Sequence, residues 1–341
     1  RDRAPWPPGT GGRQEDHRHA RLRHAVHAAV VDASSGVSQQ DADALCQVER
    51  AAAANANHRI AAEPANAVGH RIEVVVIEPR DKFTFIPSLI WVPFGMREPD
   101  DVTFDLEPVY TKKGIRFINE AAKGFDLEAQ TVTTTGGQEV SYDSLLLATG
   151  PRLAFEKIDG LGPHGGYTQS VCNLEHALLT RDAWQKFLEN PGPVVVGTAQ
   201  GGSCFGASYE FLLNTHYRIK KAGLEDVAPM TFITAEPFLG HFGLGGVADS
   251  QQRVEKYFAK LGIEGIPNNV IKEVRDGEIE LEGGRVLPFA LSMIVPPFTG
   301  VDAIRETEGL GNPMGFIPVN DEFRHEEIPN VYAAGVDVAV A

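Results

Sequence analysis

The sequence predicts an α/β protein of two Rossmann-like dinucleotide-binding domains, incomplete at both ends. Short β-branched and apolar runs at residues 73–77 and 194–196 are typical of buried parallel strands. After the second run, Gly197, Gly201 and Gly202 are spaced as in a tight turn between a strand and a helix. The 341 residues are enough for two domains of ordinary size.

Composition argues against several classes of function. The formal net charge of −15 argues against nucleic acid as a partner. No apolar run approaches the roughly 20 residues that a membrane-spanning helix needs, and no signal peptide is recognisable. Three cysteines, Cys46, Cys172 and Cys204, are too few for a disulfide framework and are not spaced for zinc. We therefore expect no metal site.

Residues 1–70 differ from the rest of the chain. They hold six of the eleven histidines and are rich in alanine and arginine, with no strand-like run and no clear apolar period. We interpret them as an atypical segment, artefactual or disordered, rather than as a metal-binding one. The chain begins at Arg1 and ends at Ala341, where a helix should follow a glycine turn. We therefore interpret it as a fragment.

The first domain is expected at residues 71–150, with a return at 301–341. Its strand at 73–77 leads to Glu78, where a carboxylate can accept a hydrogen bond from an adenosine ribose. Such a fold also requires a glycine loop about 20 to 30 residues upstream. Between Gly36 and Glu78 only Gly69 is present, so the expected loop is missing.

Two further strands of this domain are expected to end side by side. A hairpin at 130–135 and 139–142, closed by Gly136-Gly137, leads to a strand that runs into Thr149-Gly150. Near the chain end, a strand at 330–334 meets a turn at Gly335 and the acidic Asp337. Together, flanking a second βαβ unit, these two signals are typical of flavoproteins that bind two dinucleotides.

The second domain, residues 151–300, carries an altered turn. Ala199 stands at the middle glycine position, where a methyl group obstructs close approach of a pyrophosphate. Cys204 lies near the expected helix N-terminus, where the helix dipole and free N–H groups favour a thiolate. We interpret the turn as a nucleotide site converted into a thiol site.

Taken together, these segments resemble the sulfide:quinone oxidoreductase family, relatives of glutathione reductase and type 2 NADH dehydrogenase. The resemblance covers roughly residues 71–341. It rests on the motifs IEPRDKFTFIPSLIWVPFG, LLLATGPRLAF, YTQSVCNLEHA, GGSCFGASYEF, FITAEPFLGHFG and VYAAGVDVA. It implies an FAD/NAD(P)-binding fold and FAD as the cofactor.

The resemblance also implies site residues. Cys172 matches a cysteine beside the flavin, and Cys204 matches one that forms a redox bridge with a third cysteine. Acid and base residues match at Glu210, His176 and His241. Positions along the adenosine of FAD match at Glu78 and Pro79, and positions along the rest of the cofactor match at Ala122, Thr149, Gly150, Gly335 and Asp337.

The spacing of these residues along the sequence bears on some of these roles. Glu210 follows Cys204 by six residues, so one helical face does not pair them. His176 follows Cys172 by four residues and would share a face with it only if that segment is helical. His241 lies in a glycine-rich loop. The third cysteine, the quinone pocket and the membrane-seating helices belong to a C-terminal region that this chain lacks, and Cys46 has no matching context.

Four functions remain open at this point. The first is oxidation of sulfide to zero-valent sulfur or polysulfide, with electrons passed to quinone, by a parent protein at the surface of a bacterial inner membrane. The second is a sulfide dehydrogenase subunit that donates electrons to cytochrome c. The third, a type 2 NADH dehydrogenase, is disfavoured by Ala199, although Glu236 ends a strand where a ribose contact could lie. The fourth is a truncated fragment without catalysis. The chain alone is expected to be soluble and could form a homo-oligomer.

Overall fold

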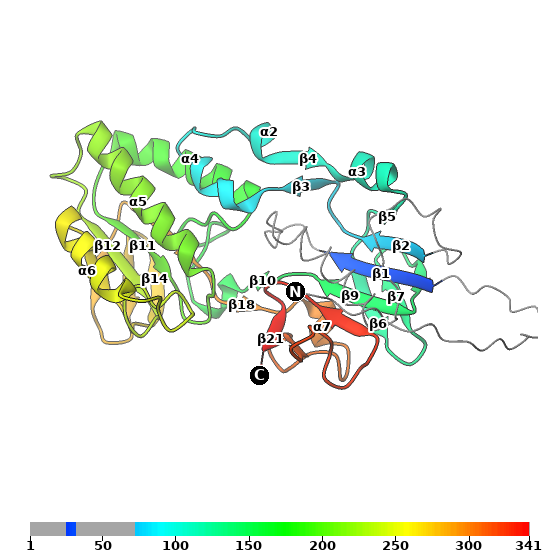
Figure 1. The fold of residues 1–341 in the computed structure, drawn as a ribbon. Helices are drawn as coiled ribbons and strands as arrows, with labels where there is room; N and C mark the ends of the chain where they lie inside the picture. Colours follow the sequence, from blue (N-terminus) through cyan, green and yellow to red (C-terminus); the bar gives the residue numbers. More distant parts are fainter. Residues whose placement is uncertain (1–24, 32–71, 341) are drawn as a thin grey trace, which may run out of the picture.

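The computed structural model describes residues 25–31 and 72–340, and two parallel sheets dominate it (Figure 1). The first sheet has the strand order β20-β9-β1-β2-β5, and neighbouring strands run parallel throughout. The strands are β1 (Ala25–Val31), β2 (Ile72–Ile77), β5 (Arg116–Ile118), β9 (Ser144–Ala148) and β20 (Val331–Ala333). The buried strand predicted at 73–77 is confirmed as part of β2.

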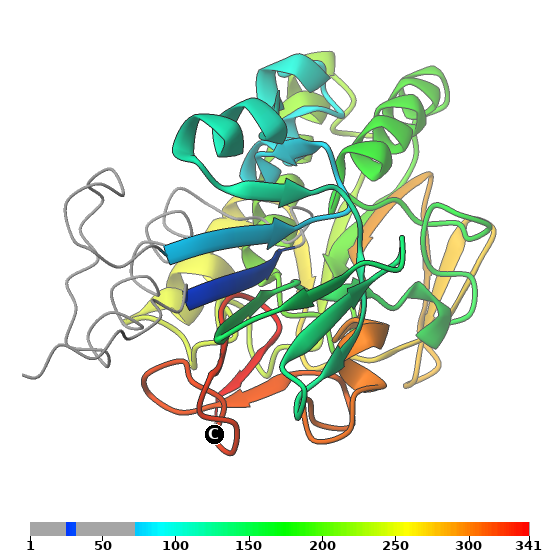
Figure 2. The same ribbon diagram turned by 90° about the vertical axis from the view of Figure 1, so that its right-hand side faces the viewer.

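Strand β1 corrects the expectation that residues 1–70 contain no strand. It is the central strand of the first sheet, with Ala28 opposite both Val75 of β2 and Leu145 of β9 (Figure 2). Pairing on both sides satisfies its backbone groups and makes it a strand despite an alanine-rich sequence. The sequence gives no signal for β1, because the glycine loop that follows the first strand of a dinucleotide-binding fold is missing after it. The segment that follows β1, residues 32–71, lies outside the described residues.

The second sheet repeats the arrangement of the first, with the order β13-β12-β11-β17 and all pairs parallel. Its strands are β11 (Val194–Thr198), β12 (Met230–Thr234), β13 (Glu264–Ile266) and β17 (Leu291–Val295). All five residues of β11 are buried, as expected for a strand covered on both faces. Its helices are α4 (Leu174–Glu189), α5 (Phe205–Ala222) and α6 (Ser250–Leu261).

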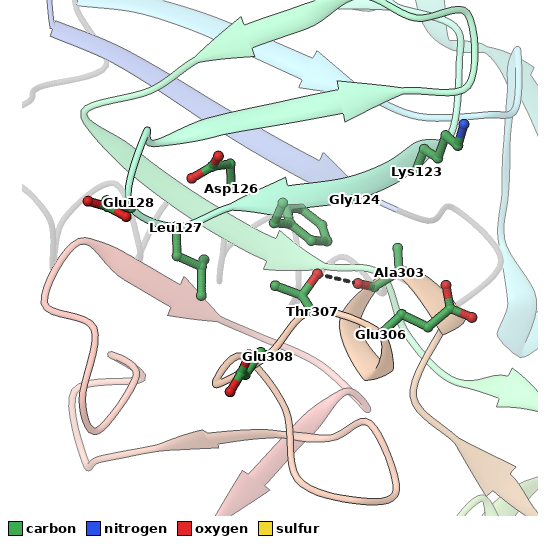
Figure 3. Close-up of a pocket in the computed structure, with 10 residues that line it drawn as sticks. Lys123, Gly124, Asp126, Leu127, Glu128, Ala303, Glu306, Thr307 and Glu308 are labelled. Carbon is green, nitrogen blue, oxygen red and sulfur yellow. Dashed lines mark hydrogen bonds between the residues drawn. The ribbon is translucent and has the colours of Figure 1, made fainter.

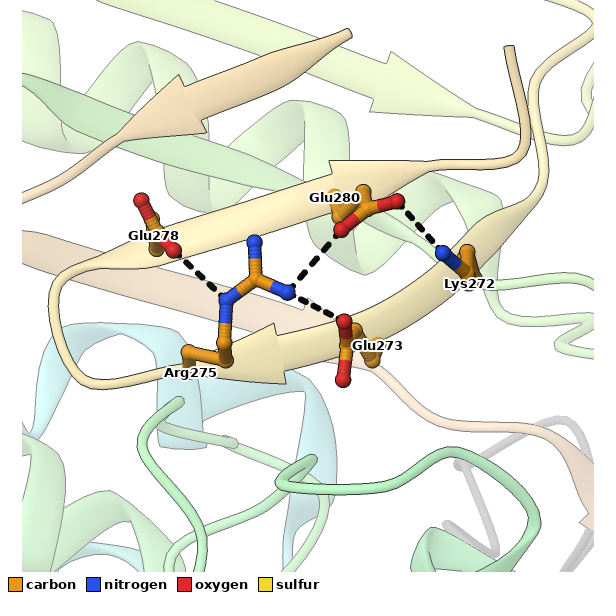
Figure 4. A network of polar contacts seen from close by, with 5 residues as sticks. All are labelled: Lys272, Glu273, Arg275, Glu278 and Glu280. Carbon is orange, nitrogen blue, oxygen red and sulfur yellow. Dashed lines mark hydrogen bonds and ion pairs between the residues drawn. The ribbon is translucent and has the colours of Figure 1, made fainter. Parts of the chain in front are cut away.

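Each parallel sheet is accompanied by a small antiparallel sheet. The first comprises β6 (Ala122–Asp126), β7 (Thr131–Thr134) and β8 (Glu139–Ser141), which confirms the predicted hairpin. The second comprises β14 (Ile271–Arg275), β15 (Glu278–Leu281) and β16 (Val286–Pro288). On its outer face Arg275 binds Glu273, Glu278 and Glu280, and Lys272 binds Glu280 (Figure 4). These charges are largely exposed to solvent and add little to stability.

An excursion after β2 ties the two sheets together. It contains β3 (Lys82–Thr84), η2 (Ile86–Trp91), α2 (Pro99–Val102), β4 (Thr103–Asp105) and α3 (Leu106–Lys113). Residues of η2 and its continuation pack against α4 and α5, where Phe94 lies against Trp184 and Phe211 (Figure 1). Arg181 of α4 fixes the excursion through hydrogen bonds to the carbonyl oxygens of Val92 and Arg97, each 2.8 Å long.

The remaining elements are short. They are β10 (Arg152–Leu153), η3 (Phe155–Lys157), β18 (Phe298–Thr299), α7 (Asp302–Arg305), β19 (Ile317–Val319) and β21 (Val338–Val340). Strands β10 and β18 pair antiparallel where the chain leaves the first sheet and where it returns (Figure 1). Among the described residues, no helix is both long and apolar enough to cross a membrane.

Candidate functional site

The carboxyl ends of β9 and β20 meet, and a buried carboxylate lies there. Thr149 and Asp337 are 188 residues apart in the chain, yet the backbone N–H and the hydroxyl of Thr149 donate to Asp337 Oδ2, over 2.9 and 3.1 Å. Asp337 Oδ1 is buried and has no hydrogen-bond partner among the described residues. Burial raises the pKa of Asp337 to about 7, against the lowering effect of the bonds from Thr149.

Glycine turns bring the backbone close to this carboxylate. Gly335 has a φ of +101°, and a Cβ built on it would lie 3.7 Å from Asp337 Oδ1. Gly150 is buried, with a φ of +63°. Both conformations favour glycine. The structure therefore brings together Thr149, Gly150, Gly335 and Asp337, four of the residues that the sequence predicts to contact the cofactor.

The other predicted cofactor residues lie elsewhere at the edge of the first sheet. Glu78 follows β2, is fully buried and accepts a hydrogen bond from the backbone N–H of Arg80 over 3.0 Å. Pro79 beside it is exposed. Ala122 begins β6 and packs partly against the core of the first sheet. Glu78 thus has the position of an acid at the end of a second strand, as a ribose contact requires.

One carboxylate oxygen of this site suits a hydroxyl group of FAD. A buried carboxylate oxygen without a partner is costly, and it becomes satisfied when a ligand hydroxyl donates to it. Asp337 Oδ1 is such an atom. The ribityl chain of FAD carries hydroxyl groups, so the carboxyl edge of β9 and β20 has the chemistry to hold it.

The two described cysteines are both free thiols. Cys204 is the N-cap residue of α5, as the sequence predicts. Cys172 precedes α4, and the hydroxyl of Ser170 accepts a bond from its backbone N–H over 3.2 Å. A thiolate at Cys204 would raise the pKa of Cys172 further, because two negative sulfurs repel each other. Cys46 lies outside the described residues.

The expected low thiol pKa is wrong for this structure. Desolvation raises the pKa of Cys172 to about 12, although a separate hydrogen bond between its thiol and the Ser170 side chain lowers it. Cys204 is an exposed residue, but partial desolvation of its thiol still raises the pKa, and the backbone N–H of Ala207 lowers it. A helix N-terminus favours a thiolate, but removal of solvent favours the neutral thiol more strongly here.

His176 is buried in the first turn of α4. Its ring Nδ1 has no hydrogen-bond partner among the described residues. Burial lowers its pKa to about 4, with a further lowering by His164, whose ring centroid is 5.2 Å away. Helix α4 begins at Leu174 with Asn173 as its cap, so Cys172 lies outside it. The shared helical face considered for Cys172 and His176 is therefore wrong, because the cap ends the helix between them.

A threonine nonetheless holds these two segments together. The hydroxyl of Thr180 lies 2.7 Å from the carbonyl oxygen of Ser170 and 2.8 Å from that of His176. The strand-like segment before Cys172 is thereby fixed to the first turn of α4. Glu210 is exposed on α5, and desolvation raises its pKa. His241 is half-buried in the loop after β12.

The turn after β11 contains Ala199, which is buried in a core cluster with Val195 and Ile233. Sequence reasoning missed the residue that matters here. Tyr209 of α5 donates a 2.9 Å hydrogen bond to Glu236, and this buried carboxylate at the end of β12 is satisfied within the fold.

A pocket of about 540 Å³ lies between β6 and the segment after α7, away from these groups (Figure 3). Its charged lining residues are Lys123, Asp126, Glu128, Glu306 and Glu308. Four carboxylates against one ammonium group repel a pyrophosphate. The pocket contains none of the predicted site residues, and no group of His, Cys, Asp or Glu among the described residues could hold a metal ion.

Comparisons with known proteins agree with this geometry. The sequence profile of a family described as pyridine nucleotide-disulphide oxidoreductase matches residues 51–340. The sulfide-quinone reductase of Aquifex aeolicus (strain VF5) is 38% identical over 275 residues, covering 79% of this chain and 63% of that protein. The mitochondrial sulfide:quinone oxidoreductase of Mus musculus is 25% identical over 279 residues, covering 77% and 59%. The chain thus spans about 60% of the length of these relatives.

Solved structures give the same result. The X-ray structure of the sulfide:quinone oxidoreductase from Aquifex aeolicus has a TM-score of 0.78 and 32% identity, covering 92% of this chain and 69% of that one. An NDH2 structure from Plasmodium falciparum in complex with NADH has a TM-score of 0.65 at 15% identity, covering 93% and 65%. The second likeness is one of fold alone.

Proposed function

This chain belongs to the pyridine nucleotide-disulphide oxidoreductase family and, within it, to the sulfide:quinone oxidoreductases, and on that premise we propose that it oxidises sulfide at Cys172 and Cys204. The family consists of FAD-binding flavoproteins. When bound, FAD supplies an acceptor for two electrons. The product is zero-valent sulfur or polysulfide, and the electrons pass on to quinone at a membrane surface.

The observation that carries the proposal is the placement of two thiols. Cys204 caps α5 at the turn where a dinucleotide would bind in related folds, and a thiolate there would raise the pKa of Cys172, the other free thiol. If Cys204 is in a disulfide with a second cysteine, attack of hydrosulfide would break the S–S bond, form a persulfide on one cysteine and release the other as a thiolate. That thiolate would hold the two electrons taken from sulfide, and the proton of hydrosulfide would pass to a base.

Proton movement is assigned to neighbouring side chains. Both thiol pKa values are raised, so both groups are neutral near pH 7 and need a base. His176 is uncharged at that pH, because its pKa is lowered to about 4, and its Nδ1 is unpartnered. A ring of such low basicity is a poor base for a thiol whose pKa is about 12, so we assign His176 the role of a hydrogen-bond acceptor beside the Cys172 segment, to which Thr180 fixes it. Glu210, whose pKa is raised, carries protons towards solvent.

Use of NADH is disfavoured by the second sheet. The carboxylate of Glu236 stands where a ribose contact could lie, but three groups of the chain donate to it: the hydroxyls of Tyr209 and Thr234, and the backbone N–H of Phe242. A ribose would have to displace these donors. Each buried donor left without an acceptor costs about 1–3 kcal/mol.

The test is an anaerobic flavin spectrum of the purified chain with FAD, before and after stoichiometric sulfide. We expect sulfide, and not NADH, to bleach the flavin absorbance. Cys204→Ser should slow the bleaching by about 100-fold or more, since it removes the sulfur that sulfide attacks, whereas Cys46→Ser should behave as the wild type. Bleaching by NADH alone would overturn the proposal. Failure to bind FAD would instead support a fragment without catalysis.

A further inference from the structure

The loop at residues 238–246, here called the His241 loop, folds around its own histidine. The backbone N–H of His241 donates to Phe238 O over 3.3 Å. Its carbonyl oxygen accepts from the N–H groups of Leu244, over 3.0 Å, and Gly246, over 2.9 Å. Both backbone polar groups of His241 are thus used within the loop, and the position of the ring depends on how the loop is anchored.

Two side chains from different helices hold Gly240, the residue before the histidine. The N–H of Gly240 donates to Tyr209 Oη over 2.9 Å, and Ser250 Oγ donates to its carbonyl oxygen over 2.8 Å. The φ of Gly240 is +82°, and a Cβ there would lie 3.0 Å from the carbonyl oxygen of Ser250. The loop therefore requires glycine at this position.

Glu236 anchors the loop on the other side of the histidine. Its Oε1 accepts from the N–H of Phe242 over 2.6 Å, and its Oε2 accepts from the hydroxyls of Tyr209 and Thr234, both over 2.9 Å. Glu236 is 2% exposed and Tyr209 is 7% exposed. Tyr209 thus donates to the acid that holds Phe242 and accepts from Gly240, so one network fixes both neighbours of His241.

The ring of His241 is oriented by the same loop. The N–H of Gly243 donates to Nδ1 over 3.2 Å, and the ring meets Phe238 edge-on at a centroid distance of 5.1 Å. A nitrogen that accepts a hydrogen bond carries no proton, so the neutral ring carries its proton on Nε2. No described residue forms a hydrogen bond with Nε2 in this structure.

We propose that Tyr209 and Glu236 are positioning residues that hold His241 as its Nε2–H tautomer, which leaves Nε2 as a hydrogen-bond donor for an anionic sulfur species. A neutral ring in this form cannot take a proton at Nε2, so His241 stabilises a sulfur anion instead of acting as the base. The identity of the anion rests on the proposed function. The tautomer and the network rest on the contacts of the loop alone.

The test uses ¹⁵N-histidine-labelled protein, with His241→Gln to assign the resonances. We expect the wild type to show protonated Nε2 and unprotonated Nδ1 at His241 above neutral pH. Tyr209→Phe removes one hydroxyl while its ring can keep its neighbours Phe232, Phe242 and Phe258. In that variant we expect mixed tautomers at His241 and about tenfold faster amide exchange at Gly240, the loss of about one buried hydrogen bond. Tyr217→Phe, an exposed tyrosine on the same helix, should change neither.

Ser250→Ala provides a second route, because it releases Gly240 from the carbonyl side and should also mix the tautomers. A protonated Nδ1 in the wild type would overturn the proposal, as would an unchanged His241 spectrum in both Tyr209→Phe and Ser250→Ala. None of these readouts needs sulfide. Failure of sulfide to reduce the flavin, with the tautomer result intact, would overturn the proposed function and leave the positioning network standing.

Discussion

Of the buried carboxylates at the carboxyl edges of the two parallel sheets, Glu236 and Asp337 differ in how well the fold satisfies them. Glu236, in the second sheet, accepts hydrogen bonds at both oxygens from three groups of the chain. Asp337, in the first, accepts from Thr149 at Oδ2, while Oδ1 is buried and has no partner within hydrogen-bond geometry among the described residues. The satisfied acid is part of the scaffold, and the unsatisfied one is ready for a ligand.

This contrast explains how one architecture supports two uses. Both sheets have parallel strands and an accompanying antiparallel sheet of three strands. In the first, the carboxyl edge offers an acceptor suited to a cofactor hydroxyl. In the second, the hydroxyl of Tyr209 donates to Glu236, the carboxylate at this edge, and Cys204 caps α5, the helix after β11. The difference lies in a few side chains at strand ends, and the strand order gives no sign of it.

Removal of the satisfied acid should produce the largest effect. Glu236→Ala leaves the hydroxyls of Tyr209 and Thr234 and the N–H of Phe242 without their acceptor, inside the protein. We expect the free energy of unfolding to fall by about 4 kcal/mol. Urea denaturation measures this, with Glu255→Ala, an exposed glutamate on α6, as the matched control. A loss below about 1 kcal/mol would show that Glu236 is not a structural acid.

The unsatisfied acid should make stability depend on pH. The pKa of Asp337 is about 7 in the folded apoprotein and about 3.9 when unfolded. Between these values the folded state holds a proton that the unfolded chain has lost, so stability falls as pH rises. From about pH 4.5 to about pH 8 we expect this group to remove about 3 kcal/mol from the free energy of unfolding.

Asp337→Asn, which cannot lose a proton, is the comparison for that measurement. The difference in unfolding free energy between wild type and variant should shift with pH by the same amount, since other groups titrate in both proteins. A constant difference across this range would mean that Asp337 is charged throughout and already has a partner.

Some of this site could be predicted from the sequence. The segment ending in Thr149-Gly150 and the segment from Gly335 to Asp337 have family signatures, and the structure places them in contact. The cap position of Cys204 follows from a β-branched run with glycines after it. Local patterns of this kind suffice because each specifies one strand and the turn that ends it.

Other features depend on tertiary contacts that no local pattern encodes. Strand β1 has no glycine motif, and its place follows from pairing with β2 and β9. The thiol pKa of Cys204 was predicted from its helix terminus, but desolvation by neighbouring segments has the larger effect. The bond from Tyr209 to Glu236 joins a helix to a strand end 27 residues later, and no local sequence pattern links the two positions.

The most direct test of the contrast is FAD affinity, measured by quenching of flavin fluorescence at about pH 8. Asp337→Ala removes the unpartnered acceptor, and we expect the Kd for FAD to rise by about 100-fold, the effect of losing a hydrogen bond to a charged group. The exposed Asp321→Ala is the matched control, and circular dichroism verifies that each variant is folded. A Kd for Asp337→Ala within about twofold of the wild type would contradict the assignment of this carboxylate to the cofactor.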